Sequence, residues 1–179
     1  MIRRLALLIA LLVLCLPAAL HAQAPDLTYE RYDVEIAVQP DGTFAVREIQ
    51  RVRFGGHFQT GFAEIPTDYT QNLLITGLSV DGVAYTAGNE SLPQQFTLEH
   101  IAGQVGLSWR YPPTEPGDTR EFVIEYQVFG GLWVYEEGDI LEWRAVPADR
   151  SGIPVEQSTI TVTLPAAIAP EEMPHIAFG

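Results

Sequence analysis

The sequence predicts an all-β fold, a two-sheet antiparallel sandwich that is immunoglobulin-like in general architecture and is preceded by a signal peptide. After residue 24, no segment carries sustained helical periodicity. Instead, short alternating runs rich in Val, Ile, Thr and aromatic residues recur between turn residues. About 155 residues follow the N-terminal segment, which is enough for one substantial core. Eight or nine strands in this length favour a sandwich over a barrel.

The N-terminal segment has the layout of a secretory signal peptide. Arg3 and Arg4 form a basic start, and the apolar run over residues 5–20 is shorter than the roughly 20 residues that span a bilayer comfortably. Small residues at Ala22 and Ala24 allow cleavage, and a retained anchor is the alternative. We therefore expect a signal peptide over residues 1–22 with cleavage after residue 22 or 24, a sandwich domain over 27–165, and an irregular tail or truncated end over 166–179.

The expected strands follow one another along the chain, each bounded by turn residues. Their side chains alternate between two rows, as in the run that places Phe122, Ile124 and Tyr126 on one face, or the run that places Leu141 and Trp143 together. In chain order the nine main runs cover residues 29–38, 43–54, 73–80, 83–85, 95–100, 105–111, 120–129, 140–146 and 158–164, and residues 62–65 are a candidate for a further short strand.

The turn between the first two runs determines how they pair. Pro40 and Asp41 favour a type I turn, and Gly42 suits the left-handed position of the bulge that follows. A three-residue loop of this kind pairs Val38 with Phe44. A two-residue loop would instead force charged residues onto the apolar side, so turn chemistry and hydrophobic pattern predict the same register.

This register places Glu48 in the inward apolar row, opposite Val34. A buried carboxylate without partners would cost several kcal/mol or become protonated. We therefore expect Glu48 to accept hydrogen bonds from backbone N–H groups, from Tyr32 or from an arginine such as Arg144, unless the strand bulges there. Because no second carboxylate or histidine forms a motif with Glu48, we expect a structural role for it rather than acid–base catalysis.

The stretch "YDVEIAVQPDGTFAVREIQRVRFGG" resembles the opening of the bacterial predicted-membrane-protein family called domain of unknown function 2207. The shared pattern is a strand, the Asp41-Gly42 turn, then Val46 and Glu48. The resemblance continues through "GFAEIP", "EFVIEYQV" and "DILEWRAV…IPVEQSTITVTLP", and covers roughly residues 27–165. At one position where the family pattern has a tryptophan, this chain has Ile153. The resemblance implies an extracytoplasmic β domain of a membrane protein, and it implies no activity or cofactor.

Composition excludes several function classes. The chain holds ten arginines and no lysine against 23 acidic residues, for a formal net charge of −13. Such a surface disfavours nucleic acid and anionic lipid, because both are bound by neutralising phosphate. The only cysteine, Cys15, lies in the expected signal peptide, so a mature chain has no disulfide, thiol nucleophile or cysteine zinc site. We expect no cofactor.

The remaining candidate chemistry is sparse. Trp109, Trp133 and Tyr135 are candidates for an exposed aromatic surface that stacks on sugar or anchors a protein, whereas Trp143 is expected in the core. The acidic stretch "YEEGD" over residues 135–139 is expected to be a solvated turn, with a Ca²⁺ site as the alternative. The histidines His57, His100 and His175 are widely spaced and lack any metal-binding spacing.

These observations favour a non-enzymatic, exported β domain of a predicted membrane or cell-envelope protein, periplasmic or at the cell surface. Its expected partner is another envelope protein or its own transmembrane region, bound by strand addition or an aromatic patch. The candidate structural and interaction residues are Glu48, Asp41, Gly42, Trp109, Trp133 and Trp143. The alternatives are a carbohydrate-active or hydrolytic module that uses Glu48 or Glu142, and a Ca²⁺-stabilised adhesion-like domain.

Overall fold

The computed structural model describes residues 27–166 except for residues 69, 137 and 147–151. The predicted signal peptide and nearly all of the predicted tail therefore lie outside the described residues. Within them, the chain forms strands and no helix, which confirms the all-β prediction. The strands are β1 (Leu27–Val38), β2 (Phe44–Phe54), β3 (Thr60–Pro66), β4 (Asn72–Val80), β5 (Val83–Ala87), β6 (Gln95–Ile101), β7 (Gln104–Arg110), β8 (Thr119–Phe129), β9 (Leu132–Trp133), β10 (Ile140–Leu141) and β11 (Ser158–Thr163).

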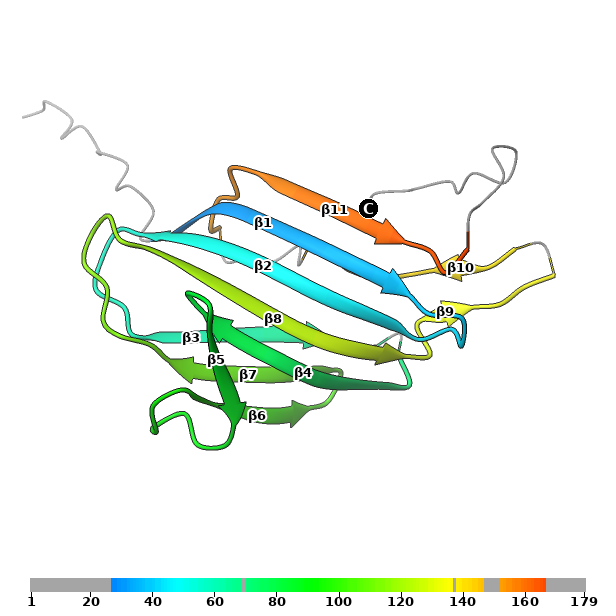
Figure 1. Cartoon of the computed structure of the whole chain (residues 1–179), viewed down its shortest axis with the longest axis horizontal. Helices are drawn as coiled ribbons and strands as arrows, with labels where there is room; N and C mark the ends of the chain where they lie inside the picture. Colours follow the sequence, from blue (N-terminus) through cyan, green and yellow to red (C-terminus); the bar gives the residue numbers. More distant parts are fainter. Residues whose placement is uncertain (1–26, 69, 137, 147–151, 167–179) are drawn as a thin grey trace, which may run out of the picture.

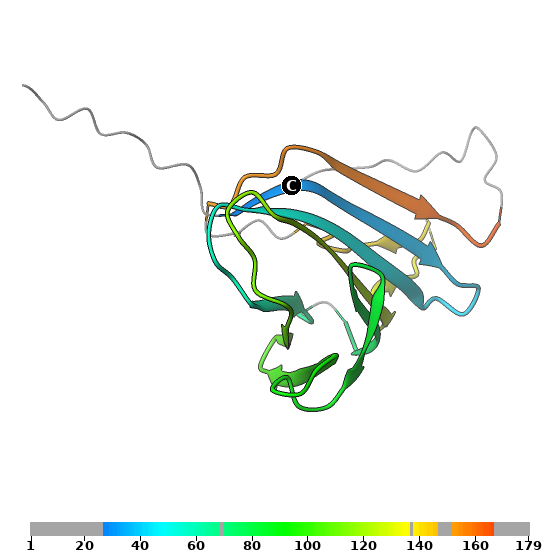
Figure 2. The same cartoon turned by 60° about the vertical axis from the view of Figure 1, so that its left-hand side comes forward.

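Nine of these strands form one sheet that turns over on itself into two layers (Figures 1 and 2). The strand order is β11-β1-β2-β8-β4-β5-β6-β7-β3, and β9 and β10 form a separate two-stranded sheet. The turn-over occurs at β5, whose first half pairs with β4 while Thr86 and Ala87 pair with β6. Antiparallel pairing dominates as predicted, but β1·β11 and β5·β6 are parallel.

The first hairpin has the predicted register. Val38 faces Phe44 and Val34 faces Glu48 across the β1·β2 pair. Gly42 has a φ of 81°, so it occupies the left-handed conformation that glycine adopts without strain. The Asp41 carboxylate accepts hydrogen bonds from the hydroxyl and the backbone N–H of Thr43, and these bonds lower the pKa of Asp41. Turn chemistry therefore determines the register, as the sequence indicated.

The two faces of β2 have opposite character. Arg47, Arg51 and Arg53 lie on the outer face, where each pairs with a glutamate. The inner row begins with the buried Phe44 and Val46 and packs against the inner rows of β1 and β8. The second layer covers this core with buried residues of β3, β6 and β7, namely Ile65, Phe96, Val105, Leu107 and Trp109.

The expectation that Trp109 is exposed was wrong. Trp109 is only 2% exposed and lies in the core between the layers. Its register partner on β3 is Gly61, and a Cβ atom built on Gly61 would lie 2.4 Å from Cε2 of the indole. The glycine therefore leaves the space that the indole fills. Trp109 also packs against Phe122 of β8, with ring centroids 5.6 Å apart.

The predicted strand over residues 140–146 is much shorter than expected. Only Ile140 and Leu141 pair, opposite Trp133 and Leu132. The residues that follow leave the ladder, although Trp143 and Ala145 still turn toward the core. No helix in the described part of the chain has the length and apolar character needed to cross a membrane.

Candidate functional site

Glu48 lies at the centre of a buried polar cluster on the inner face of β2. One carboxylate oxygen, Oε2, accepts a hydrogen bond from the Tyr32 hydroxyl at 2.6 Å and another from Gln50 Nε2 at 3.0 Å. The other oxygen, Oε1, accepts a hydrogen bond from the Tyr126 hydroxyl at 2.7 Å. These donors come from β1, β2 and β8, so the carboxylate joins three adjacent strands. Tyr32 is the donor that the sequence predicted, whereas Tyr126 was missed and Arg144 is exposed.

The electrostatics of this cluster favour a protonated Tyr126. Burial raises the pKa of Tyr126 well above 10.0, and the adjacent Glu48 carboxylate raises it further. Tyr126 therefore keeps its proton and donates it in a hydrogen bond. Charge-assisted bonds of this kind are shorter and stronger than neutral ones. Three donors offset the desolvation cost that a lone buried carboxylate would carry.

The same geometry buries the Glu48 carboxylate. Glu48 is 6% exposed, and both of its oxygens are occupied. The indole of Trp143 lies beside the cluster, with its ring centroid 5.8 Å from that of Tyr126. A general acid or base must come within hydrogen-bonding reach of the substrate. The cluster therefore joins three strands from a buried position.

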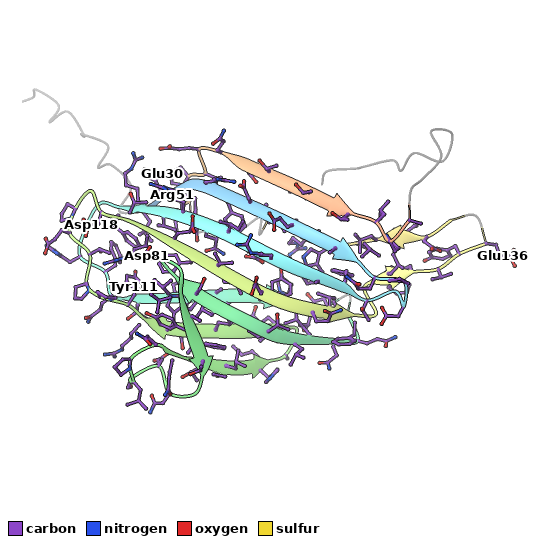
Figure 3. All side chains as sticks on the ribbon, viewed as in Figure 1. Glu30, Arg51, Asp81, Tyr111, Asp118 and Glu136 are labelled. Carbon is purple, nitrogen blue, oxygen red and sulfur yellow. The ribbon has the colours of Figure 1, made fainter. Side chains whose placement is uncertain are left out.

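Two of the predicted aromatic residues, Trp133 and Tyr135, lie exposed on the hairpin formed by β9 and β10, and Phe62 is exposed on β3. Trp133 is 45% exposed and Tyr135 is 55% exposed, and the neighbouring Val134 and Ile140 are also exposed. Figure 3 shows this hairpin extending beyond the sandwich, with Glu136 at its outer end. Trp143 follows β10 in the chain, and its ring packs against that of Phe44 with the centroids 5.5 Å apart, so Trp143 joins the core as predicted.

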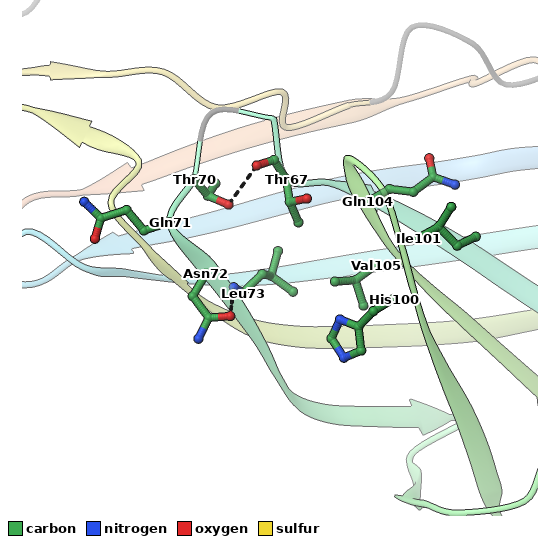
Figure 4. Close-up of a pocket in the computed structure, with 9 residues that line it drawn as sticks. All are labelled: Thr67, Thr70, Gln71, Asn72, Leu73, His100, Ile101, Gln104 and Val105. Carbon is green, nitrogen blue, oxygen red and sulfur yellow. Dashed lines mark hydrogen bonds between the residues drawn. The ribbon is translucent and has the colours of Figure 1, made fainter.

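A solvent-open hollow of about 410 Å³ lies where the β3–β4 connection meets the turn between β6 and β7 (Figure 4). Its floor is the buried pair Leu73 and Val105. The other residues that line it are uncharged, apart from any protonation of His100, and are Thr67, Thr70, Gln71, Asn72, Ile101 and Gln104. No sequence signal marked this hollow, because its walls come from segments about 30 residues apart that only the folded sheet brings together.

The described residues include no group of three histidine, aspartate or glutamate side chains placed to hold a metal ion. His57 contacts the Thr114 carbonyl oxygen at 3.1 Å and the Glu115 carboxylate at 3.3 Å. His100 borders the hollow, whereas His175 lies outside the described residues. The acidic stretch over residues 135–139 includes residue 137, which the structure does not describe, so the Ca²⁺ alternative stays a prediction.

A family model described as the N-terminal domain of a predicted membrane protein, DUF2207, matches residues 28–175. The chain belongs to this family. The match confirms the resemblance seen in the sequence, and it extends over every strand of the DUF2207 domain described above. A search of curated proteins finds no match for this chain.

Among solved structures, the DUF2207 domain is similar to M1 zinc metallopeptidases. The enzyme from Deinococcus radiodurans matches at 13% identity and a TM-score of 0.38, over 58% of this chain and 20% of the peptidase. A mutant of a two-domain M1 zinc metallopeptidase bound to L-tryptophan matches at 14% identity and a TM-score of 0.39, over 63% of this chain and 23% of the other. The chain thus spans about a fifth of these enzymes, and TM-scores below 0.5 support no inference about its activity.

Proposed function

We propose that this chain is a non-enzymatic, extracytoplasmic interaction domain of a membrane protein, and that the β9–β10 hairpin binds a protein partner. The observation that carries the proposal is the exposure of Trp133, Val134, Tyr135 and Ile140 on one projecting element. Contiguous exposed apolar surface of this kind is typical of interaction sites. Tryptophan and tyrosine are also the residues most enriched among those that dominate binding energy at protein interfaces.

The charge around the hairpin indicates the kind of partner. Glu136, Asp139 and Glu142 are all exposed on or beside it. These carboxylates disfavour insertion into a lipid surface, because burying a charge carries a large desolvation cost. They favour a protein whose apolar contact area is bordered by arginine or lysine.

Three further observations support the rest of the proposal. The burial and hydrogen bonding of Glu48 support the non-enzymatic part, because one of the two carboxylates that the hydrolytic alternative would use is sealed in the core; the other, Glu142, is exposed. The N-terminal sequence supports export, since residues 1–22 have the layout of a signal peptide. Membership of a family of predicted membrane proteins supports a location at a membrane.

The test is site-specific photo-crosslinking in cells that express the full chain at its native level. A photoreactive amino acid at position 133 or 135 should yield one discrete adduct, because a docked partner lies within reach of the hairpin. The matched control is position 62, where an exposed phenylalanine lies on β3. Substituting the neighbouring Val134 with Glu should remove the adduct at 133. The proposal fails if positions 133 and 135 give no adduct, or if position 62 gives the same one.

A further inference from the structure

Strand β11 is an unprotected edge of the nine-stranded sheet. It pairs with β1 on one side, and among the described residues no strand pairs with its other side. Both views show β11 as the outermost ribbon of its layer (Figures 1 and 2). All six of its residues are exposed. The backbone groups on that side have no strand partner within the described part of the chain and can pair with another strand.

The residues of β11 lack the usual protection of an edge strand. Natural sheets protect edges with charged side chains, proline or bulges. Residues 158–163 contain no charge and no proline, and five consecutive residues are β-branched. The opposite edge of the sheet, β3, carries the exposed Glu64 and ends at Pro66. The two edges of the same sheet thus differ, and only β3 is protected in the usual way.

Alternate residues of β11 direct their backbone N–H and C=O groups to opposite sides of the strand, so one hydrogen bond to β1 identifies which residues direct theirs to the open edge. The Tyr32 N–H donates to the Gln157 carbonyl oxygen at 2.9 Å, so odd-numbered residues direct their backbone groups toward β1. The even-numbered residues, including Ile160 and Val162, therefore direct theirs to the open edge. The side chains of these two residues continue the inner row of β1 beyond Val34 and Ile36. They remain 40% and 44% exposed, respectively.

We propose that β11 pairs with β11 of a second copy of this chain, antiparallel and across a two-fold axis, so that the two sheets become continuous. Such an interface is isologous, and it requires a strand that is complementary to itself. Two registers that fit the outward-facing even residues overlap equally, and the one that pairs apolar residues with apolar residues places Thr161 opposite Thr161 of the second copy and Ile160 opposite Val162. Apolar side chains then meet apolar ones on one face, and threonines meet on the other. Cross-strand pairs of both kinds stabilise sheets.

Charge selects a second copy at this edge and disfavours one at the other. Each chain carries a formal charge of −13, so two copies repel wherever acidic side chains come face to face. β11 contributes no charged residue to the contact, whereas pairing through β3 would bring Glu64 of each copy to the interface. The dimer uses a different surface from the β9–β10 hairpin, so it neither requires nor replaces the partner proposed above.

The test is sedimentation velocity of the full chain over a range of concentrations, with paired charge variants. Thr161 is exposed on the outer face, so Thr161→Lys and Thr161→Glu should fold normally. Each should weaken the dimer at least about tenfold, because like charges then oppose one another at the axis. Mixing the two variants in equal amounts should restore the dimer, because opposite charges then meet. The matched control is Thr60→Lys on the β3 edge, which should leave the dimer unchanged.

Each contrary result overturns the proposal. These results are a wild-type chain that stays monomeric at every concentration, a dimer that persists in both Thr161 variants, and a mixture that fails to recover the dimer. Loss of the dimer in Thr60→Lys would assign the contact to β3 instead. Association through the apolar N-terminal segment would persist in all variants, so it is distinguished from pairing of β11. The crosslinking result at positions 133 and 135 is independent of these outcomes.

Discussion

At the scale of single residues, Glu48 shows how a charged side chain can belong to an apolar row. The strand turns every second side chain inward, and Glu48 falls on an inward position. The fold retains it because Tyr32, Gln50 and Tyr126 supply three hydrogen bonds. Removing one member of such a network leaves other buried polar groups unpaired, which costs more than an average hydrogen bond contributes.

We expect Glu48→Gln to lower the free energy of unfolding by about 1–3 kcal/mol. In this variant, an amide N–H₂ group replaces one of the two acceptor oxygens of Glu48. That group then faces a hydrogen-bond donor that contacts a carboxylate oxygen in the wild-type protein. Chemical denaturation measures the loss. The matched control is Glu35→Gln, since Glu35 is an exposed neighbour on β1 paired with Arg47 at 3.2 Å, and that change should cost less than about 1 kcal/mol. Equal unfolding free energies for wild type and Glu48→Gln would contradict the structural role.

The buried tyrosines predict loss of stability at alkaline pH. The pKa of Tyr126 is raised well above 10.0 in the folded chain, and burial raises that of Tyr111 to about 12. A folded-state pKa above the unfolded value gives stability that is present below pH 10 and is lost as the pH rises toward the folded pKa. The free energy of unfolding should therefore fall above about pH 10.

The variant Tyr126→Phe separates the effect of Tyr126 ionisation on stability from other effects of alkaline pH. The variant loses a hydrogen bond to Glu48 and should be less stable at pH 7, but its stability should decline less steeply above pH 10, because one raised pKa is gone. Tyr111→Phe should also make the decline less steep, since the folded-state pKa of Tyr111, about 12, lies above this pH range as well. Denaturation curves from pH 7 to 11 measure both slopes. An unchanged slope in Tyr126→Phe would show that Tyr126 has no raised pKa.

At the scale of elements, β3 and β7 depend on a glycine opposite a tryptophan. Gly61→Ala places a methyl group 2.4 Å from the Trp109 indole, which is too close for any real contact, so strand or ring must move. Overpacking of this kind typically costs about 1–3 kcal/mol. Thermal unfolding should show the loss as a lower Tm.

Gly106→Ala is the matched control for this change. Gly106 lies in β7 of the same layer, and the contact that its new Cβ would make closest is 3.6 Å, to the Glu99 carbonyl oxygen. That is an ordinary van der Waals distance, and the φ of Gly106 is not in the left-handed region. We therefore expect Gly106→Ala to leave the Tm nearly unchanged. Similar losses in the two variants would show that the indole does not restrict position 61.

The elements also show where local pattern predicts well. The turn over residues 39–43 determines the β1·β2 register because its chemistry is local to five residues. The run over residues 140–146 alternates equally well, yet only two residues pair. Alternation of apolar and polar residues predicts the face on which each side chain lies, but a strand forms only where a neighbouring strand pairs with it along its length.

At the scale of the whole molecule, the two proposed contacts lie on different elements. The β9–β10 hairpin presents aromatic and acidic side chains, whereas β11 presents an uncharged backbone edge. The hairpin would bind through its side chains and β11 through backbone hydrogen bonds, so a mutation in one surface should leave binding at the other unchanged. A domain with two such surfaces can form a dimer and still bind a different protein.

The amino-acid sequence by itself determined the all-β class, the strand rows, the first hairpin and the inward direction of Glu48, because each depends on side-chain alternation and turn chemistry within a few residues. Only the tertiary structure decided which rows are covered. It buried Trp109 over Gly61, brought Tyr126 to Glu48 from 78 residues away, and left the apolar row of β11 open. Those outcomes depend on the order of strands in the sheet, and contacts between distant strands leave no signal in local sequence.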